Sequence, residues 1–198
     1  MSGRIFHSFH VGCFTVIPAG DSPPDPCGLP IILGKKGAFG SGEHETTAAC
    51  LELLPAIPGL ADRHVLDLGS GTGILALAAA RLGASAIVAV DLDEAAARSC
   101  QENSCFNGFE DQITTVCGEL ATVAGQHFDL ILANIYADIL LSLAEPLVSM
   151  TSAGGYLLLS GIPLQDKFDI QQRYGRLNCN IIDRRIGEEF ATYLLQKS

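Results

Sequence analysis

From residue 46 to the end of the chain, strand-like and helix-like segments alternate, and this alternation restricts the possible folds more than any other feature of the sequence. Apolar runs of strand length occupy residues 64–68, 86–92, 113–117, 128–134 and 155–161. Helix-like segments lie before and between them, at residues 46–54, 74–83, 94–106 and 137–150. Nearly continuous apolar strands that are separated by helices are typical of a parallel sheet buried on both faces. We therefore predict an α/β fold with a doubly wound, mostly parallel sheet.

Both ends of the chain depart from this alternation. Residues 177–197 contain two strand-like runs joined by a tight connection, which predict an antiparallel edge of the sheet. Near the N-terminus, short β-like runs at residues 5–18 and 29–33 flank a loop rich in proline and glycine. We predict a β-rich extension with a glycine-rich loop over residues 1–45, followed by the main domain over residues 46–198.

The composition argues against several classes of protein. Nearly half of the 198 residues are apolar, so a disordered chain is not expected. No apolar run is long enough to span a bilayer and the N-terminal residues lack the apolar region of a signal peptide, so we expect a cytoplasmic protein with no membrane partner. The formal net charge of −10 argues against a nucleic-acid partner and suits a cationic one. The seven cysteines are scattered and include no C-x-x-C pair, so we expect buried free thiols and no metal site.

The segment VLDLGSGTG, residues 65–73, places three glycines directly after the first strand of the main domain. In doubly wound folds this strand-to-helix turn is the usual ligand cradle, and glycines let its backbone turn tightly and approach a ligand. The three positions are Gly69, Gly71 and Gly73. A dinucleotide fingerprint, G-x-G-x-x-G, would require a further glycine where Ile74 stands, so an NAD-dependent oxidoreductase is disfavoured.

Acidic residues follow the strands that surround this turn. Asp67, at the end of the first strand, would be unfavourable beside pyrophosphate but favourable beside an ammonium group, such as that of S-adenosylmethionine. Asp91 lies about twenty residues after the glycine turn, where an acid accepts hydrogen bonds from ribose hydroxyls; the alternative is a solvated strand-end acid. Asp93 fits a helix cap better, because the next helix begins at the following residue. Glu119, after the third strand, could line an adenine pocket or lie exposed in a loop.

Asn134, Ile135 and Tyr136 follow the fourth strand at the same edge of the predicted sheet. A side-chain amide there can accept a hydrogen bond from a substrate amine and donate another, so Asn134 could orient a nucleophile. A helix cap is the alternative for Asn134, and an ordinary surface or core aromatic is the alternative for Tyr136.

Several motifs together resemble one protein family. They are GAFGSGEHETT (37–47), LDLGSGTGILALAAARLGA (66–84), VAVDLDEAA (88–96) and ANI (133–135), with weaker support from GYLLLSGI and GEEF nearer the C-terminus. These segments are similar to motifs of the PrmA family of ribosomal-protein lysine methyltransferases. The resemblance implies the seven-stranded fold of class I S-adenosylmethionine-dependent methyltransferases, with S-adenosylmethionine as the cofactor. It also implies methylation of a lysine or another amine in a protein, such as a cationic ribosomal protein.

The resemblance assigns roles to particular positions. The family's cofactor contacts fall on Thr47, Gly69, Asp91 and Asn134. Phe39 and the loop 40–44 are implied to close over the methionine end of the cofactor and the target amine. The segment GKKGAFGSG is not a phosphate-binding P-loop, because it lacks the Gly-Lys-Ser/Thr ending.

The chain also departs from the family's pattern. Residues 43–45 read Glu-His-Glu where the family usually has Thr-His-Pro, and Ser41 stands where it usually has Thr. Lysines occupy residues 35–36, where an Asp-Pro pair usually precedes the loop. The β-rich stretch before Leu33 is too short for the N-terminal domain with which the family grips its ribosomal substrate.

The implied chemistry requires little covalent work from the protein. Methyl transfer from a sulfonium is an in-line displacement, so the protein contributes mainly alignment and exclusion of water. An amine acceptor must first lose a proton, which desolvation or a nearby positive charge favours by lowering its pKa. We therefore expect no conspicuous base: Asn134 would orient the amine. Ile135, Tyr136 and Phe39 would shape the pocket, and His44 is either a base or part of its wall. A methyltransferase for RNA or a small molecule, and a non-catalytic binding module with the same fold, are the alternatives.

Overall fold

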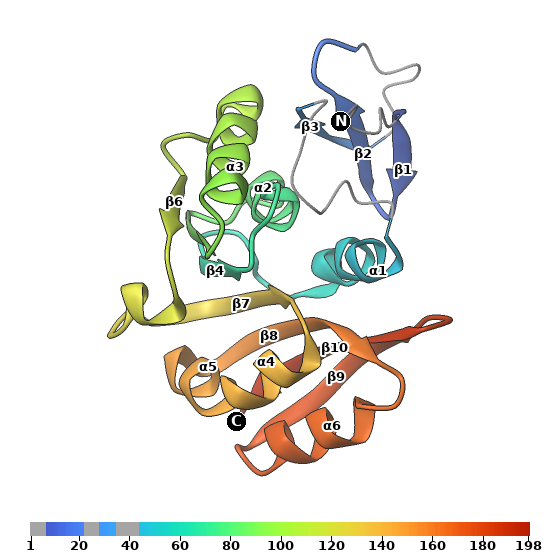
Figure 1. The fold of residues 1–198 in the computed structure, drawn as a ribbon, viewed down its shortest axis with the longest axis vertical. Coiled ribbons are helices and arrows are strands. Elements are labelled where there is room, and N and C mark those ends of the chain that lie inside the picture. Colours follow the sequence, from blue (N-terminus) through green and yellow to red (C-terminus); the bar gives the residue numbers. More distant parts are fainter. Residues whose placement is uncertain (1–6, 22–27, 35–43) are drawn as a thin grey trace.

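The computed structural model describes residues 7–21, 28–34 and 44–198, and a seven-stranded sheet runs through its centre (Figure 1). The strands follow the order β6-β5-β4-β7-β8-β10-β9. Their bounds are β4 His64–Leu68, β5 Ala86–Asp91, β6 Ile113–Cys117, β7 Phe128–Asn134, β8 Thr151–Pro163, β9 Cys179–Ile186 and β10 Phe190–Lys197. β10 is antiparallel to both of its neighbours, whereas the pairs from β6 to β8 are parallel. The predicted doubly wound, mostly parallel sheet with an antiparallel C-terminal pair is confirmed.

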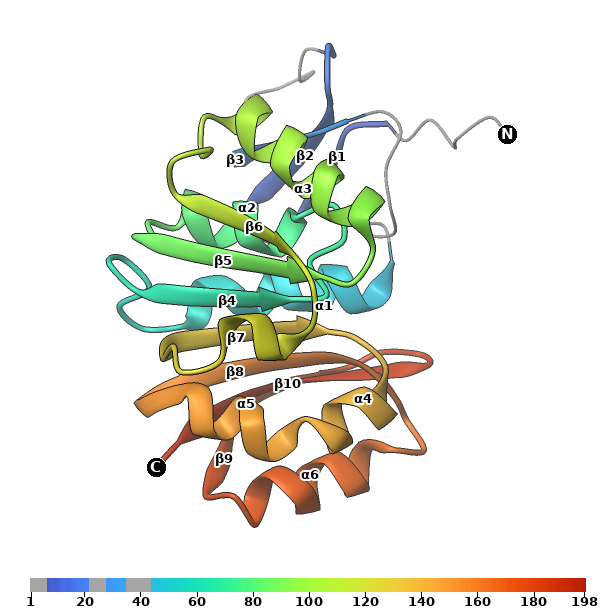
Figure 2. The ribbon, with the colours of Figure 1, turned by 60° about the vertical axis from the view of Figure 1, so that its left-hand side comes forward.

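Helices cover both faces of this sheet (Figures 1 and 2). One face carries α1 Glu45–Leu53, α2 Ile74–Arg81 and α3 Glu94–Asn107. The other face carries α4 Ala137–Ser142, α5 Ala144–Met150 and α6 Lys167–Gly175. Two short 3₁₀ helices, η1 Leu54–Ala56 and η2 Leu120–Val123, follow α1 and β6.

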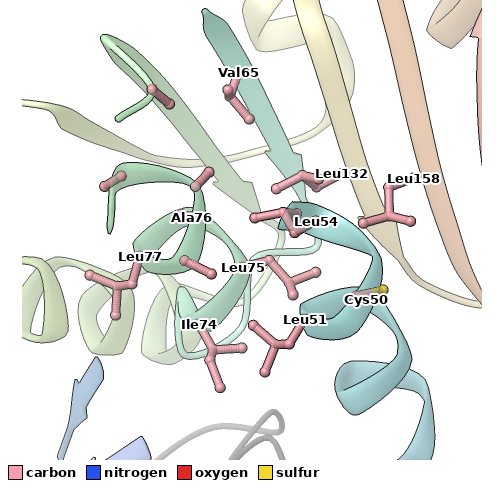
Figure 3. Close-up of a cluster of buried hydrophobic side chains, with 14 of the residues drawn as sticks. Cys50, Leu51, Leu54, Val65, Ile74, Leu75, Ala76, Leu77, Leu132 and Leu158 are labelled. Atoms are coloured by element: carbon pink, nitrogen blue, oxygen red, sulfur yellow. The ribbon is translucent and has the colours of Figure 1, made fainter. Parts of the chain in front are cut away.

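Successive side chains of the central strands point into two different hydrophobic cores, which explains why these strands are apolar throughout. Val65, Leu132 and Leu158 lie in the core beneath α1 and α2 (Figure 3). Leu66 and Ile131 lie in the core beneath the helices of the other face. All five side chains are fully buried, and each such burial contributes roughly 1.5–3 kcal/mol.

A second, three-stranded sheet packs on α2 and α3. It consists of β1 Phe9–Val11, β2 Phe14–Pro18 and β3 Leu29–Leu33, and its buried side chains belong to the same hydrophobic core as those of α1 and α2. Asn107 of α3 fixes β3 like a neighbouring strand, because its Oδ1 accepts from the Ile32 N–H at 2.9 Å and its Nδ2 donates to the Ile32 carbonyl at 2.7 Å. The β-rich character of the N-terminal region is therefore confirmed, and the division into residues 1–45 and 46–198 stays a prediction.

Two elements differ from those predicted. Residues 137–150 form two helices, not one, because the ring of Pro146 clashes with the carbonyl four residues earlier and supplies no N–H to bond it. The chain bends at Leu143, between α4 and α5. Helix α6 was not predicted, since it buries only Ile170 and Tyr174 and so carries little apolar periodicity.

Two expectations from the composition can be compared with the structure. Cys50, Cys100 and Cys179 are buried, and burial raises the pKa of the Cys100 thiol to about 11. The expectation of buried thiols is wrong for three others, Cys13, Cys105 and Cys117, which are exposed because they lie in a turn, on an outward helix face and at a strand end. The seventh cysteine, Cys27, lies outside the described residues. Within the part of the chain that the structure describes, no helix has both the length and the apolar character that a bilayer crossing requires.

Candidate active site

The strand order reverses between β4 and β7, and the site forms at this point of reversal. From β4 the sheet extends through β5 and β6 on one side, and from β7 through β8 on the other. The carboxyl ends of these parallel strands share one edge, to which their arrowheads point in Figure 2. Ligands of open α/β sheets bind at such a switch point. A cavity of about 970 Å³ lies along this edge, lined by residues that follow β4, β5, β6 and β7 and by the first turn of α1.

Asp91, at the end of β5, lies at the wall of this cavity and braces the glycine turn. Its Oδ2 accepts from the Gly71 N–H at 2.8 Å, and its Oδ1 accepts from the Asp93 N–H at 3.0 Å. A carboxylate has about four lone-pair sites, so two remain available for a ligand's hydroxyl groups. Asp93 caps α3 by accepting from the Ala95 N–H at 2.9 Å, as predicted.

The three glycines of the turn allow close approach to different parts of the chain. All three have positive φ, at +72°, +55° and +79° for Gly69, Gly71 and Gly73. Gly69 and Gly71 line the cavity, and a Cβ at Gly69 would lie 2.4 Å from the Ile135 side chain. A Cβ at Gly73 would lie 2.5 Å from the Cys100 sulfur, so the close approach at Gly73 is to α3. A contact of Gly73 with the cofactor stays a prediction.

Asp67 is buried beneath the turn, with 1% of its surface exposed. Its Oδ2 accepts from the Ala76 N–H at 3.0 Å, and so satisfies one of the free N–H groups in the first turn of α2. Burial raises the pKa of Asp67 to about 7, the Ala76 hydrogen bond opposes this rise, and the charge of Asp91 adds to it. Both the protonated and the ionised form of Asp67 are therefore populated near neutral pH.

A small polar niche of about 30 Å³ adjoins Asp67. It is also lined by Thr47, Ser70 and Asn134. The buried Ser70 hydroxyl has no hydrogen-bond partner of ordinary geometry among the residues that the structure describes, although it interacts weakly with the Cys100 thiol. An unsatisfied buried hydroxyl beside a buried carboxyl group is suited to a small charged or polar group of a ligand.

Asn134 and Thr47 meet across this niche, although 87 residues separate them in the sequence. The Asn134 Nδ2 donates to the Thr47 hydroxyl at 3.2 Å, which leaves its Oδ1 as an acceptor. Thr47 is buried in the first turn of α1, and Asn134 is half-buried at the end of β7. The structure thus brings Thr47, Gly69, Asp91 and Asn134 together around adjoining cavities.

The other predicted site residues occupy the rim of the cavity, with one exception. Ile135 is half-buried, and its backbone approaches Gly161 so closely that a Cβ there would lie 2.5 Å from the Ile135 carbonyl oxygen. Tyr136 is 78% exposed at the N-cap of α4, and Glu119 is exposed before η2. Phe39 lies outside the described residues.

Phe190 and His44 both line the cavity, although the sequence interpretation gave Phe190 no role and left His44 as either a base or part of the wall. Phe190, the first residue of β10, contacts the His44 ring edge-on with the ring centres 5.5 Å apart. The Nδ1 of His44 lies 2.8 Å from the Thr46 hydroxyl, and His44 caps α1. Phe190 closes the GEEF motif, but only the insertion of β10 between β8 and β9 brings it to the site.

The strand order with one antiparallel strand, together with a glycine turn and a strand-end acid at the switch point, defines the class I methyltransferase fold. The sequence model of one family within this class, described as ribosomal protein L11 methyltransferase (PrmA), matches residues 2–198. The chain belongs to this family.

Individual relatives agree with this assignment. A ribosomal protein L11 methyltransferase of Pelobacter propionicus is 46% identical over 152 residues, which cover 74% of this chain and 49% of that protein. The corresponding protein of Myxococcus xanthus is 37% identical over 98% of this chain and 66% of its own length. The chain therefore spans about half to two thirds of the length of these curated relatives. The crystal structure of a ribosomal protein L11 methylase from Lactobacillus delbrueckii subsp. bulgaricus has a TM-score of 0.87 and 28% identity, with 98% of this chain and 100% of that chain covered.

Proposed function

We propose that this chain is an S-adenosylmethionine-dependent methyltransferase that methylates a lysine or another amine of a protein, with a cationic ribosomal protein as the substrate. The observation that carries the proposal is the cavity at the switch point, which Asp91 and Asn134 line, together with the adjoining niche lined by Asp67, Ser70 and Asn134. The names of the curated relatives, ribosomal protein L11 methyltransferases, support the substrate class.

The residues of the cavity fit the parts of this cofactor. The two free lone-pair sites of Asp91 suit the ribose hydroxyls, and the rim near Glu119 and Leu120 suits the adenine. The Asp67 carboxylate and the unsatisfied Ser70 hydroxyl suit the amino-acid end, with its ammonium and carboxylate groups. When bound, the cofactor supplies an electrophilic methyl group on a positively charged sulfur.

The chain's own residues align and dehydrate the acceptor. The Asn134 Oδ1 can accept a hydrogen bond from the acceptor amine, and its amide is held in place by the bond to Thr47. Ile135, His44 and Phe190 also line the cavity, and a substrate that binds against them would displace water from it. Removal of water favours the neutral amine, which is the nucleophilic form, so a dedicated base is not required.

The charge and the composition fit such a substrate. The formal net charge of −10 steers a cationic protein toward the chain and repels nucleic acid. A ribosomal substrate agrees with the expected cytoplasmic location.

Titration calorimetry with S-adenosylmethionine tests the cofactor, with NAD as the comparison ligand. We expect S-adenosylmethionine to bind and NAD not to bind. Asp91→Ala should abolish binding because it removes the ribose acceptors and the brace of Gly71, whereas Asp111→Ala, at an exposed acid away from the cavity, should bind normally. No binding of either ligand to the folded chain would overturn the enzyme proposal and favour a binding module.

A transfer assay with a radiolabelled methyl group tests the acceptor. Purified ribosomal protein L11, a tRNA and a rRNA fragment are offered in parallel. Label on lysine or another amine of the protein is the expected result. Label on RNA alone would replace the protein substrate with the RNA alternative.

A further inference from the structure

Glu45, the first residue of α1, bridges two backbone N–H groups of the turn between β9 and β10. Its Oε2 accepts from the Glu188 N–H at 3.0 Å, and its Oε1 accepts from the Glu189 N–H at 3.1 Å. Hydrogen bonds from two N–H groups to one carboxylate are charge-assisted and fix the geometry of both partners. More than 140 residues separate the two sides, so this contact exists only in the folded chain.

Gly187 is the residue that makes this contact possible. Its φ is not positive, so backbone conformation does not require glycine there. A Cβ at Gly187 would instead overlap a carboxylate oxygen of Glu45, at 2.2 Å. The glycine at the start of the GEEF motif therefore leaves room for the Glu45 carboxylate.

The turn that Glu45 holds carries Phe190 into the cavity wall. The Gly187 N–H donates to the Phe190 carbonyl at 2.8 Å, and the Leu164 N–H donates to the Glu189 carbonyl at 3.0 Å. The turn is thus fixed by α1 on one side and by the residue that follows β8 on the other. Phe190 in turn contacts His44, the residue directly before Glu45. The two aromatic rings are therefore linked to the clamp, by which we mean the Glu45 carboxylate and the two N–H groups that it accepts from.

We propose that Glu45 is a positioning residue for the acceptor: its carboxylate holds the β9–β10 turn so that Phe190 and His44 together form the wall of the cavity near Asn134. The proposal rests on the proposed function, because it assigns this wall to the acceptor amine. Glu45 is not among the residues that line the cavity, so in this proposal it acts through Phe190.

The chain contains a matched control at the other end of the same helix. The Oε2 atom of Glu52 in α1 lies 3.5 Å from the Nε atom of Arg185 in β9, and both side chains are about half exposed. This pair also joins α1 to the β9–β10 hairpin, but it lies away from the cavity. A general tether between helix and hairpin predicts equal effects at Glu45 and Glu52, whereas a positioning role predicts effects at Glu45 alone.

Amide hydrogen exchange tests the clamp without any ligand. In Glu45→Ala the amides of Glu188 and Glu189 should exchange faster, because both lose their acceptor, and in Glu52→Ala they should keep their protection. Glu45→Gln, which keeps one acceptor oxygen, should give an intermediate result. Unchanged exchange in Glu45→Ala would overturn the proposal.

Steady-state kinetics test the role in transfer. Glu45→Ala should lower kcat/KM for the acceptor roughly 10- to 100-fold through misplacement of the wall, while the Kd for S-adenosylmethionine stays within about twofold of the unaltered chain. Glu45→Ala combined with Phe190→Ala should be no worse than Phe190→Ala alone, because Glu45 acts through Phe190. Additive losses, or the same loss in Glu52→Ala, would overturn the proposal.

The two proposals fail in distinguishable ways. If the unaltered chain neither binds S-adenosylmethionine nor transfers a methyl group, the proposed function fails and the acceptor role fails with it. The exchange experiment would still measure the clamp in that case. If the unaltered chain is active and Glu45→Ala is equally active, only the positioning role is wrong.

Discussion

At the scale of single residues, burial of the Asp67 carboxylate costs free energy of folding when the group is ionised, and a cationic ligand group would reduce this cost. Its folded-state pKa of about 7 lies above the ordinary value of 3.8, so the folded chain binds a proton more tightly than the unfolded chain. Stability attributable to this group is therefore fully present below pH 3.8 and is lost as the pH rises toward 7. Above pH 7 the folded chain bears the whole cost of a buried charge.

Asp67→Asn should separate stability from ligand binding. The amide can still accept from Ala76 and carries no charge, so the variant should be more stable than the unaltered chain at pH 8, by at most about 4 kcal/mol. The gain should shrink as the pH falls from 7 to 4, as measured by urea unfolding at several pH values. Binding of S-adenosylmethionine should weaken, because the partner of its ammonium group is lost. A variant that is less stable than the unaltered chain at pH 8 would contradict this account, and Asp111→Asn serves as the exposed control.

At the scale of elements, the strands were predictable and the helix boundaries less so. A strand such as β7 is buried on both faces, so its apolar run is visible in the sequence without knowledge of its neighbours. Helix α6 buries two side chains and shows no such pattern, and the break at Leu143 depends on a single proline. The glycine turn illustrates the same limit, because the sequence shows the glycines but not that Gly73 faces Cys100 of α3.

The packing of α3 on the glycine turn gives a prediction at this scale. Gly73→Ala should destabilise the fold by roughly 2–4 kcal/mol, since it combines a positive φ with a Cβ placed against the Cys100 sulfur. Gly108→Ala at the C-terminal end of α3 has a similar φ but open space around its Cβ, so it should cost only about 1 kcal/mol. Denaturant unfolding of the two variants measures the difference. Equal losses would show that backbone strain, not packing against α3, determines the need for glycine.

At the scale of the whole molecule, the N-terminal sheet and the larger sheet share one hydrophobic core. Phe14, Ile31 and Leu33 are at most 1% exposed and belong to the core of α1 and α2. Asn103 adds a polar link: its Oδ1 accepts from the Gly34 N–H and its Nδ2 donates to the Thr72 carbonyl in the glycine turn, both at 2.8 Å. The sequence predicted the strands of this region, but its attachment to the site depends on asparagines that composition and periodicity do not single out.

A fragment that begins at residue 44 tests this attachment. This fragment lacks at least three buried side chains, Phe14, Ile31 and Leu33, each of which contributes roughly 1.5–3 kcal/mol. Their sum is comparable to the free energy of unfolding of an ordinary domain. We expect the fragment to bind the dye ANS and to lack a cooperative thermal transition, in contrast to the full chain. A cooperative transition at the temperature of the full chain would show that residues 44–198 are an independent folding unit.

The position of β10 also determines when the cavity is completed during synthesis. β10 lies between β8 and β9, although it is made after both, so β9 has no partner in the large sheet until residues 190–197 have emerged. The same residues bring Phe190 to the cavity and the turn before it to Glu45, which is made well before them. A nascent chain on the ribosome can therefore form the glycine turn early, but the wall that we assign to the acceptor forms only after β10 has been inserted.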